Sequence, residues 1–271
     1  MQLLHIFGDG QNSQQFMIFV LIFMFCWNLE NIYGVTKDYK KWRHDMTNAL
    51  FVIPGAALQF VLGYLFVKVL VFENDNCYGL LPKLGLDSSK EQIIATFIFL
   101  DLTYYIYHYL MHKVKLVWPF HAVHHSDMVL NVSTSLREHP VETCIRLGHY
   151  MLSAWFLGTA FWIMTLHQFV QIISKIIIHS NFRLPEKLDK YLSYLIITPN
   201  MHHVHHHFQE PYTDSNYGDL FSVWDRMFGT FTYLDRHEVV FGLDKTNDKA
   251  LKFKDLIALP IKDKKALNTT E

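Results

Sequence analysis

Histidine side chains gather at three points of this chain, with spacings that suit metal binding. The segments are YYIYHYLMHK, FHAVHH and MHHVHH, and the last two share the spacing HxxHH. On a helix, residues at i, i+3 and i+4 project to one side, so each segment predicts a patch of two or three imidazoles. The histidines concerned are His108, His112, His121, His124, His125, His202, His205 and His206.

These eight side chains are too many for the coordination shell of one ion. Without a metal they would be a costly set of partly buried polar groups. Imidazole suits iron, copper, zinc and nickel, so two metal ions explain the set most economically. His167, Gln171, Lys175 and His179 also recur every four residues along an apolar stretch. Polar groups inside a membrane are functional candidates, and we take His179 as the ninth ligand. The scattered histidines His5, His44, His149 and His237 are interpreted as ordinary core or interfacial groups.

Nine nitrogen ligands without a carboxylate cage would leave two divalent ions strongly positive, which suits activation of O2. Two irons together can supply the electrons that cleave the O–O bond, and the oxidant formed can take hydrogen from an unactivated C–H bond. Hydrolysis at zinc is the competing chemistry, but the HExxH motif of zinc proteases is absent, as is the GxSxG motif of serine hydrolases. No glycine-rich nucleotide loop occurs either, so electrons would come from a separate redox protein.

The elements that carry these residues are those of a membrane protein. The chain of 271 residues is 51% hydrophobic and 18% charged, and its net charge of −1 gives no basic excess for nucleic acid. Cys26, Cys77 and Cys144 are odd in number and far apart, so no disulfide framework is expected. A bilayer needs about 20 residues of helix. The apolar stretches are Phe16–Trp27, Met46–Phe72, Ile93–Leu110 and Ile145–Ile178.

The first stretch is short enough to be a signal peptide, but no Lys or Arg precedes Lys37, which favours a membrane anchor. The last stretch has 34 residues, and a single crossing would place the third histidine segment across the membrane from the second. A hairpin with Gly158 and Thr159 near its tip avoids this. Basic residues after the first and third stretches predict a cytoplasmic histidine cap.

The expected fold is therefore an all-α polytopic membrane bundle with a histidine-rich di-metal cap on the cytoplasmic side. We divide it into membrane anchor helices over residues 1–92, a histidine-box domain over 93–235 with its membrane hairpin at 145–178, and a cytoplasmic tail over 236–271. Basic side chains after Lys245 are interpreted as a solvated face.

The ordered motifs HYLMH, HAVHH, SLREHPVE, IIIHSN, TPNMHHVHH and DSNYGDLFSVWDRMFGTF resemble the fatty acid hydroxylase/sterol desaturase superfamily. The resemblance runs from about Asp101 to Phe231. It implies a non-haem di-iron membrane enzyme that uses O2 to hydroxylate or desaturate a lipid. The superfamily's ligand pattern falls on His108, His112, His121, His124, His125, His179, His202, His205 and His206.

Residues around the expected ligands have smaller predicted roles. Asp101 either orients His108 or is a polar group at the helix end. Lys175 stands where many relatives have Gln or His, and we favour its reaching to the membrane interface over its orienting a water or peroxide. His203 and His207 are interpreted as neighbours of the ligands or as exposed. Near the site we also expect an ion pair among Arg137, His139 and Glu142 of REHPVE. Asp225 and Arg226 are expected to hold the C-terminal tail against the core.

The leading functional hypothesis is a di-iron hydroxylase acting on a fatty acyl chain, a sterol-like ring, a carotenoid or an ether lipid. A lipid desaturase is the alternative at the same site, and a membrane metal carrier or sensor is the non-enzymatic one. The expected electron donor is a cytochrome b5-like protein, a ferredoxin or a reductase. A bacterial inner membrane is favoured over the endoplasmic reticulum, since no retention signal is present.

Overall fold

Helices make up the described part of the chain, which in this computed structural model comprises residues 11–76, 79–86, 88–243 and 251–262. Within these ranges the only β-structure is two isolated bridges. The helices are α2 (Gln11–Tyr33), α3 (Lys41–Ala49), α4 (Val52–Asn76), α5 (Leu80–Lys83), α6 (Ser89–Lys113), α7 (Trp118–His125), η1 (Val132–Leu136), α8 (Pro140–Leu157), α9 (Phe161–His179), α10 (Glu186–Leu192), α11 (Pro199–His205), α12 (Val223–Met227) and α13 (Phe253–Lys262). The predicted all-α fold is confirmed.

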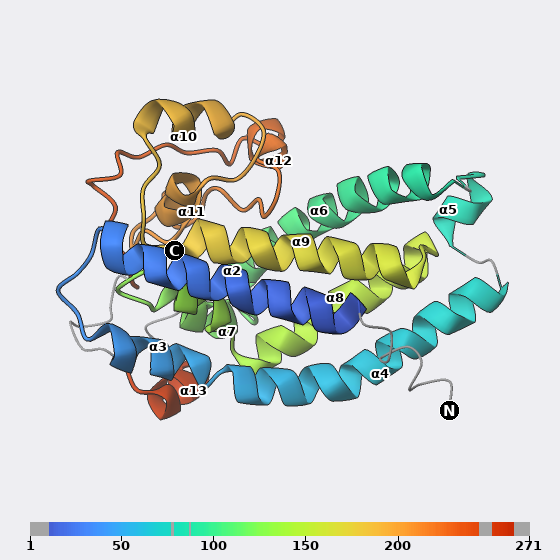
Figure 1. Cartoon of the computed structure of the whole chain (residues 1–271), viewed down its shortest axis with the longest axis horizontal. Coiled ribbons are helices and arrows are strands. Elements are labelled where there is room, and N and C mark those ends of the chain that lie inside the picture. Colours follow the sequence, from blue (N-terminus) through green and yellow to red (C-terminus); the bar gives the residue numbers. More distant parts are fainter. Residues whose placement is uncertain (1–10, 77–78, 87, 244–250, 263–271) are drawn as a thin grey trace.

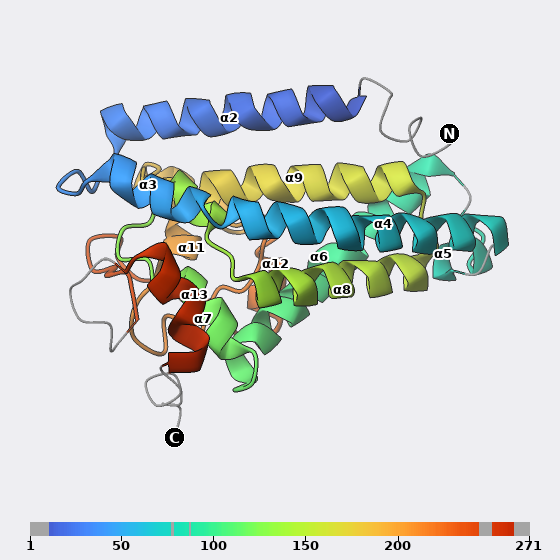
Figure 2. The same ribbon diagram turned by 90° about the horizontal axis from the view of Figure 1, so that it is seen from below.

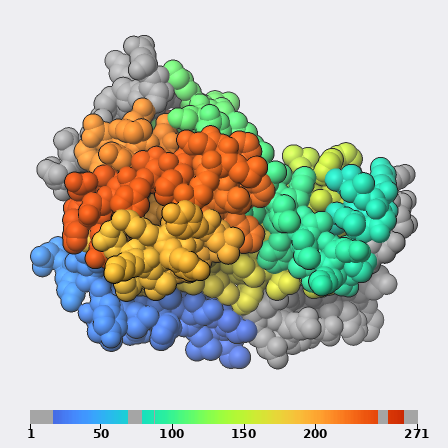
Figure 3. All heavy atoms as spheres, turned by 90° about the horizontal axis from the view of Figure 1, so that it is seen from above, coloured from blue at the N-terminus to red at the C-terminus, as the bar shows by residue number. Residues whose placement is uncertain are grey.

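The long helices α2, α4, α6, α8 and α9 lie side by side with their axes roughly along the longest dimension of the molecule (Figure 1). The short helices α3, α7, α10, α11, α12 and α13 gather at one end, on the left of Figures 1 and 2. Figure 3 shows residues of about 180–240, in gold and orange, forming a continuous cover over this end. One end of the bundle is therefore a cap of short helices and loops.

Three helical stretches are long and apolar enough to cross a membrane: Lys41–Lys68, Ser89–Lys113 and Phe161–His179. They correspond to the second, third and fourth apolar stretches of the sequence. The first stretch lies in α2, whose apolar part Met17–Tyr33 is shorter. It packs against α9, in agreement with an anchor helix. The long helices expose many large apolar side chains, such as Phe60, Leu152 and Trp162, as expected for a lipid-facing surface.

The fourth apolar stretch forms two helices, α8 and α9, and the chain turns between them. His139 and Pro140 start α8, since the ring of His139 accepts a hydrogen bond from the Val141 amide (3.2 Å) and proline is favoured in a first turn. Gly158 ends α8 with φ of +64°, a conformation that glycine adopts without strain. Its backbone lies so close to Gly79 that a Cβ on Gly158 would be 2.6 Å from the Gly79 Cα.

Local signals also fix the helices that carry the first and third histidine segments. Ser88 and Glu91 form a reciprocal capping box at the start of α6. Thr198 caps α11 by accepting a hydrogen bond from the Met201 amide (3.3 Å), and Pro199 occupies the first turn. Both helices thus start at a residue whose side chain can cap them.

A few expectations lie outside the described residues, namely those for His5, for Cys77 and for the tail at 244–250 and 263–271. Cys26 and Cys144 are free thiols. The division into anchor, histidine-box domain and tail stays a prediction.

Candidate metal centre

The nine histidines selected from the sequence meet in two adjoining groups beneath the cap. One, the five-histidine group, consists of His108, His112, His121, His125 and His205. The other, the four-histidine group, consists of His124, His179, His202 and His206. Within each group one ring nitrogen per residue lies within 4.8 Å of all the others. The groups are in contact, since the rings of His125 and His206 stack with centroids 4.4 Å apart.

Each HxxHH segment contributes to both groups rather than to one. In α7, His121 and His125 belong to the five-histidine group, whereas His124 belongs to the other. In α11 and its C-cap residue His206 the assignment is reversed, because His202 and His206 share the four-histidine group and His205 belongs to the five-histidine group. In each segment, the two histidines four residues apart therefore share a group. The remaining histidine, His124 or His205, belongs to the other group. Sequence spacing predicted one face per segment but not this division.

Hydrogen bonds behind the rings fix their orientation. Nδ1 donates to a backbone carbonyl in four cases: His108 to Tyr217 (2.8 Å), His205 to Ser215 (2.7 Å), His124 to Arg137 (3.1 Å) and His179 to Lys175 (2.7 Å). In His121 and His112 it lies against a carboxylate, of Glu142 (2.7 Å) and Asp214 (3.2 Å). A donor Nδ1 leaves the Nε2 lone pair free, and such outer partners are typical of metal-bound histidines.

The inward nitrogens lack ordinary partners. His112 Nε2 and His205 Nε2 are buried without a hydrogen-bond partner. The Nε2 atoms of His124 and His202 lie 3.0 Å from Nε2 of His179, and those of His108 and His125 lie 3.1 and 3.2 Å from Nε2 of His121. Lone pairs this close, directed at a common point, are the arrangement that a bound cation would relieve. The residues present therefore fit two metal ions.

Burial keeps five of the clustered rings neutral. It lowers the pKa of His205 to about 3 and the pKa values of His124, His125, His202 and His206 well below the usual value for histidine. For the latter four, neighbouring imidazoles act in the same direction. Neutral imidazole is the form that binds a metal, so the groups are ready to coordinate at neutral pH.

The cap segment Asp214–Phe221 supplies partners that the histidine pattern did not reveal. It provides the carbonyls of Ser215 and Tyr217 and the carboxylate of Asp214 behind three of the rings. Asp225 holds this segment by accepting from the amides of Tyr217 (2.7 Å) and Gly218 (2.9 Å). Because every residue has a backbone carbonyl, the histidine pattern could not identify these partners. The NYG and WDR motifs were the only sequence signals for this segment.

Asp101 does not contact His108. Its carboxylate accepts hydrogen bonds from the amides of Leu220 (3.1 Å) and Phe221 (3.2 Å) and from the indole of Trp224 (2.7 Å). It thus ties α6 to the cap segment, and the expectation that it orients His108 directly is wrong.

The expected ion pair within REHPVE is also wrong, because each residue faces a different partner. Arg137 pairs with Asp127 (3.0 Å), and Glu142 bonds to His121. His139 caps α8 and lies 3.3 Å from the Ile257 carbonyl. Among these three, Glu142 is the one directly behind a histidine of the candidate site.

Lys175 does not extend to the membrane interface. Its ammonium lies 3.9 Å from Glu138 and over the ring of Tyr104. It lines a cavity of about 20 Å³ together with Tyr104, Glu138, Asp219 and several of the clustered histidines. The helix turn that places His179 at the site points Lys175 into the interior beside it.

His203 and His207 belong to neither group, but both are buried, so exposure is the wrong expectation for them. His203 lies 3.2 Å from the Ser180 carbonyl through Nε2 and packs edge-on against Phe241. His207 Nδ1 accepts from the Gln209 amide (3.1 Å). They stabilise the cap around α11. The histidine run thus divides into three clustered and two structural residues.

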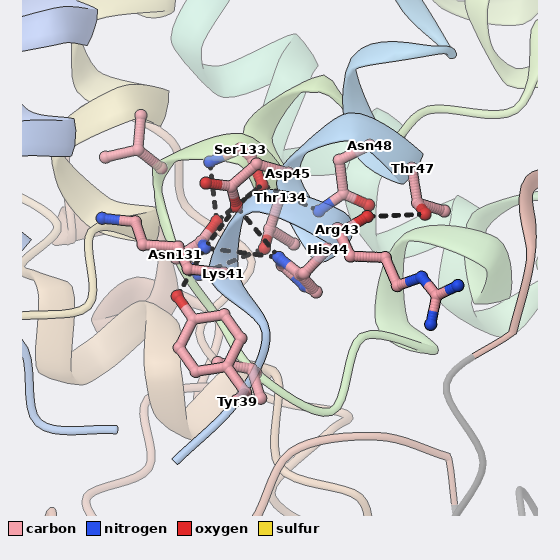
Figure 4. Close-up of polar contacts among 12 residues, drawn as sticks. Tyr39, Lys41, Arg43, His44, Asp45, Thr47, Asn48, Asn131, Ser133 and Thr134 are labelled. Atoms are coloured by element: carbon pink, nitrogen blue, oxygen red, sulfur yellow. Dashed lines mark hydrogen bonds and ion pairs between the residues drawn. The ribbon is translucent and has the colours of Figure 1, made fainter. Parts of the chain in front are cut away.

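The loop after the second histidine segment is held from the N-terminal side of the chain (Figure 4). Asp45 of α3 accepts from Asn131 (2.8 Å) and Ser133 (2.9 Å), and Asn48 donates to Ser133 (3.0 Å). Glu30 of α2 accepts from the Val132 amide (2.8 Å). The anchor helices therefore position the loop that carries Arg137, whose carbonyl accepts from His124.

Comparison with known proteins gives a consistent picture. The family described as fatty acid hydroxylase matches residues 93–230. Alkylglycerol monooxygenase of Caenorhabditis elegans is 31% identical over 66% of this chain and 34% of its own length. Ornithine lipid hydroxylase of Rhizobium tropici is 26% identical over 52% of this chain and 41% of its own length. Human lathosterol oxidase is 27% identical over 54% of this chain and 47% of its own length. The chain thus spans about a third to a half of these relatives. No solved structure matches it.

Proposed function

Since the chain belongs to the fatty acid hydroxylase family, we propose that it is an integral membrane oxidoreductase that uses two non-haem irons and O2 to hydroxylate a C–H bond of a lipid. The observation that carries the proposal is the pair of buried histidine groups, with five and four converging imidazoles. The named relatives are lipid hydroxylases or oxidases, which supports the substrate class and the reaction type.

Iron is proposed on the chemistry of the donor set. Nine imidazoles in two adjoining groups suit a pair of redox-active ions, and imidazole is a good iron ligand. When bound, two irons would supply the electrons that activate O2 for attack on an unreactive C–H bond. The histidines would hold them, and Glu142, Asp214 and the carbonyls of Ser215 and Tyr217 would keep the imidazoles oriented.

The protein's own contribution is enclosure. All nine histidines are buried, with exposed fractions between 0% and 8%, under a cap that the Asp101 and Asp225 contacts tie down. Exclusion of water keeps a strong oxidant from side reactions. A closed, dry site of this kind is what oxidation of an unreactive alkyl chain requires.

Three adjoining cavities mark the approach that we propose for a lipid chain from the bilayer side towards the histidines. A cavity of about 200 Å³ between α4 and α8 shares Gln59 and Gln168 with a second cavity of about 320 Å³. The second cavity shares Ser135, Glu138 and Lys175 with the small space beside the histidines. Because α4 and α9 are candidate membrane spans, a chain entering between them would come from the bilayer.

The membrane orientation we propose places the histidine end in the cytoplasm. Lys37, Lys40 and Arg43 lie in or just before α3, which is one of the short helices at the cap end (Figure 1). Lys113 is the last residue of α6, and basic residues are enriched in cytoplasmic loops. The proposed partner is a separate donor of electrons, a cytochrome b5-like protein, a ferredoxin or a reductase. A bacterial inner membrane stays the favoured location. A metal carrier should offer ligands along a path through the bilayer, whereas both histidine groups lie at one end.

The test is lipid analysis of cells grown under labelled O2 that express either the native chain or His205→Ala. A lipid that gains one labelled oxygen only with the native chain supports the hydroxylase and identifies its substrate. A lipid that loses two hydrogens without label would show a desaturase instead. No difference between the strains, with an electron donor confirmed present, would overturn the proposal. Iron analysis of the purified chain should give about two irons per molecule.

A further inference from the structure

A cavity of about 500 Å³ is lined in part by residues of the 126–137 loop, which follows the second histidine segment. Its volume is in the range of small-molecule sites. It is formed by the N-terminal part of α3, the loop after α7 and the residues just before α13. Its walls include Lys40, Arg43, Ser126, Asp127, Arg137 and Lys252. None of these residues belongs to either histidine group.

The charge around this cavity is predominantly positive. Lys40, Arg43 and Lys252 are exposed at its edge, and no ion pair involving them is found among the described residues. In Figure 4 the guanidinium of Arg43 extends away from the polar network around His44. The one acidic group in the wall, Asp127, is already bonded to His44 (2.7 Å) and paired with Arg137. Within the part of the chain that the structure describes, these three cations therefore form no ion pair with a carboxylate.

Arg137 adds a buried donor to the wall of the cavity. It is 4% exposed, and its two Nη atoms contact Asp127 and Ser126, each at 3.0 Å. Its Nε–H is buried without a hydrogen-bond partner among the described residues. Asp127 and Ser126 therefore hold Arg137 in place as a buried part of the cavity wall.

The location suits an anion at the membrane boundary. Lys40 immediately precedes the candidate span Lys41–Lys68, and Arg43 lies in its first turn. Phosphates of lipid headgroups lie at this depth, and basic clusters bind them. The side chains of Met128, Val129 and Leu251 give the cavity an apolar wall as well.

We propose that this cavity is a binding site for a phosphate group, carried either by a bilayer lipid headgroup or by a small soluble phosphate ester. Lys40, Arg43 and Lys252 provide the positive field at the edge of the cavity. The site is separate from the histidine groups and needs no metal, so it stands or falls independently of the proposed hydroxylase activity.

The experiment uses the full chain in a maltoside detergent, which contains no phosphate, and follows its melting temperature. Inorganic phosphate is one probe. The other is dihexanoyl phosphatidic acid below its micelle concentration, with uncharged dihexanoylglycerol as the control for the acyl chains. Arg43→Gln/Lys252→Gln removes two cations from the cavity. Lys37→Gln/Lys187→Gln is the matched control, since it makes the same charge change at exposed residues that do not line it.

A rise in melting temperature with inorganic phosphate would assign a soluble phosphate compound, and a rise with phosphatidic acid alone would assign a lipid headgroup. In either case the half-saturating concentration should increase about tenfold or more in Arg43→Gln/Lys252→Gln and stay unchanged in the control variant. No rise with either probe would overturn the proposal. So would an equal response of both double variants, or a rise that dihexanoylglycerol reproduces.

Discussion

The two histidine groups differ in what stands behind their rings. In the five-histidine group, His121 and His112 have carboxylate partners, Glu142 and Asp214. In the four-histidine group the partners found are backbone carbonyls, of Arg137 for His124 and of Lys175 for His179. A carboxylate raises the basicity of an imidazole more than a carbonyl does. We therefore expect the five-histidine group to hold its metal more tightly than the other.

The number of ligands also favours tighter metal binding by the five-histidine group. Loss of one imidazole leaves four nitrogens in the five-histidine group but only three in the other. The first group thus has a ligand in reserve, and the second does not. Two metal sites of unequal affinity would lose their ions one after the other. Substitution of single histidines can test this order of metal loss.

The largest effect is expected from His202→Ala in the four-histidine group. Iron should fall from about two to about one per chain and activity should fall below about one per cent, more than the 10–100-fold typical for loss of a partner behind a ligand. His112→Ala in the five-histidine group should retain more iron. Metal analysis of the two purified variants checks this, with His207→Gln as a control that keeps both ions. Equal iron loss in the two alanine variants would abolish the distinction.

The second effect concerns the stability of the metal-free protein as pH falls. The pKa of His205 is lowered to about 3, and that of His124, His125, His202 and His206 is lowered as well. Below pH about 6.5 the unfolded chain takes up protons that the folded chain does not, so stability is complete above that pH and is lost as pH falls towards 3. Each such histidine contributes up to about 1.4 kcal/mol per pH unit.

Melting temperatures of chelator-treated protein between pH 7.5 and 5 measure this loss. His206→Gln removes one of the titrating groups, so its melting temperature should depend less steeply on pH. A melting temperature that stays constant over the range would show that the rings are not kept neutral by burial.

Replacement of the partners behind the rings gives a smaller effect that tests the carboxylate argument itself. Glu142→Gln keeps the shape of the side chain but removes its charge, and metal affinity of the five-histidine group should fall about 10–100-fold. Asp214→Asn should cost less, because Asp214 is also paired with Lys113 at a partly exposed position (2.5 Å). Competition with a graded chelator measures both. If Asp214→Asn proves the more damaging, the ranking by burial is wrong.

The smallest effect is expected at Lys175, which lies beside the histidines. Lys175→Met removes the ammonium near Glu138, which keeps its bonds to Arg146 (3.0 Å). Iron content should be unchanged, while turnover falls about tenfold, the effect of one lost charged contact. Lys187→Met on exposed α10 is the matched control. Loss of iron in Lys175→Met would indicate that the residue supports the ligands rather than the cavity.

The sequence predicted the groups of histidines because helical periodicity is local. Spacings of three and four residues, with caps at Ser88 and Thr198, are sufficient to bring the rings of one segment together. The partners behind the rings depend on contacts between distant segments. Asp101 meets residues about 120 positions later, and no local pattern encodes this. The role of Lys175 depends on the same long-range packing, so its predicted reach to the membrane interface was wrong. For His203 only the alternative of exposure was wrong.

The crossing-over of the HxxHH histidines makes α7 and α11 intolerant of any change in length. A helix turns by about 100° per residue, so one inserted residue would rotate each imidazole beyond it away from its own group and towards the other. His121 and His125 would no longer share a group, and neither would His202 and His206. A lipid-facing helix such as α4 can absorb an added residue at its end as a small shift in depth. Insertional scanning should therefore find two short segments, α7 and α11, that do not tolerate even one inserted residue.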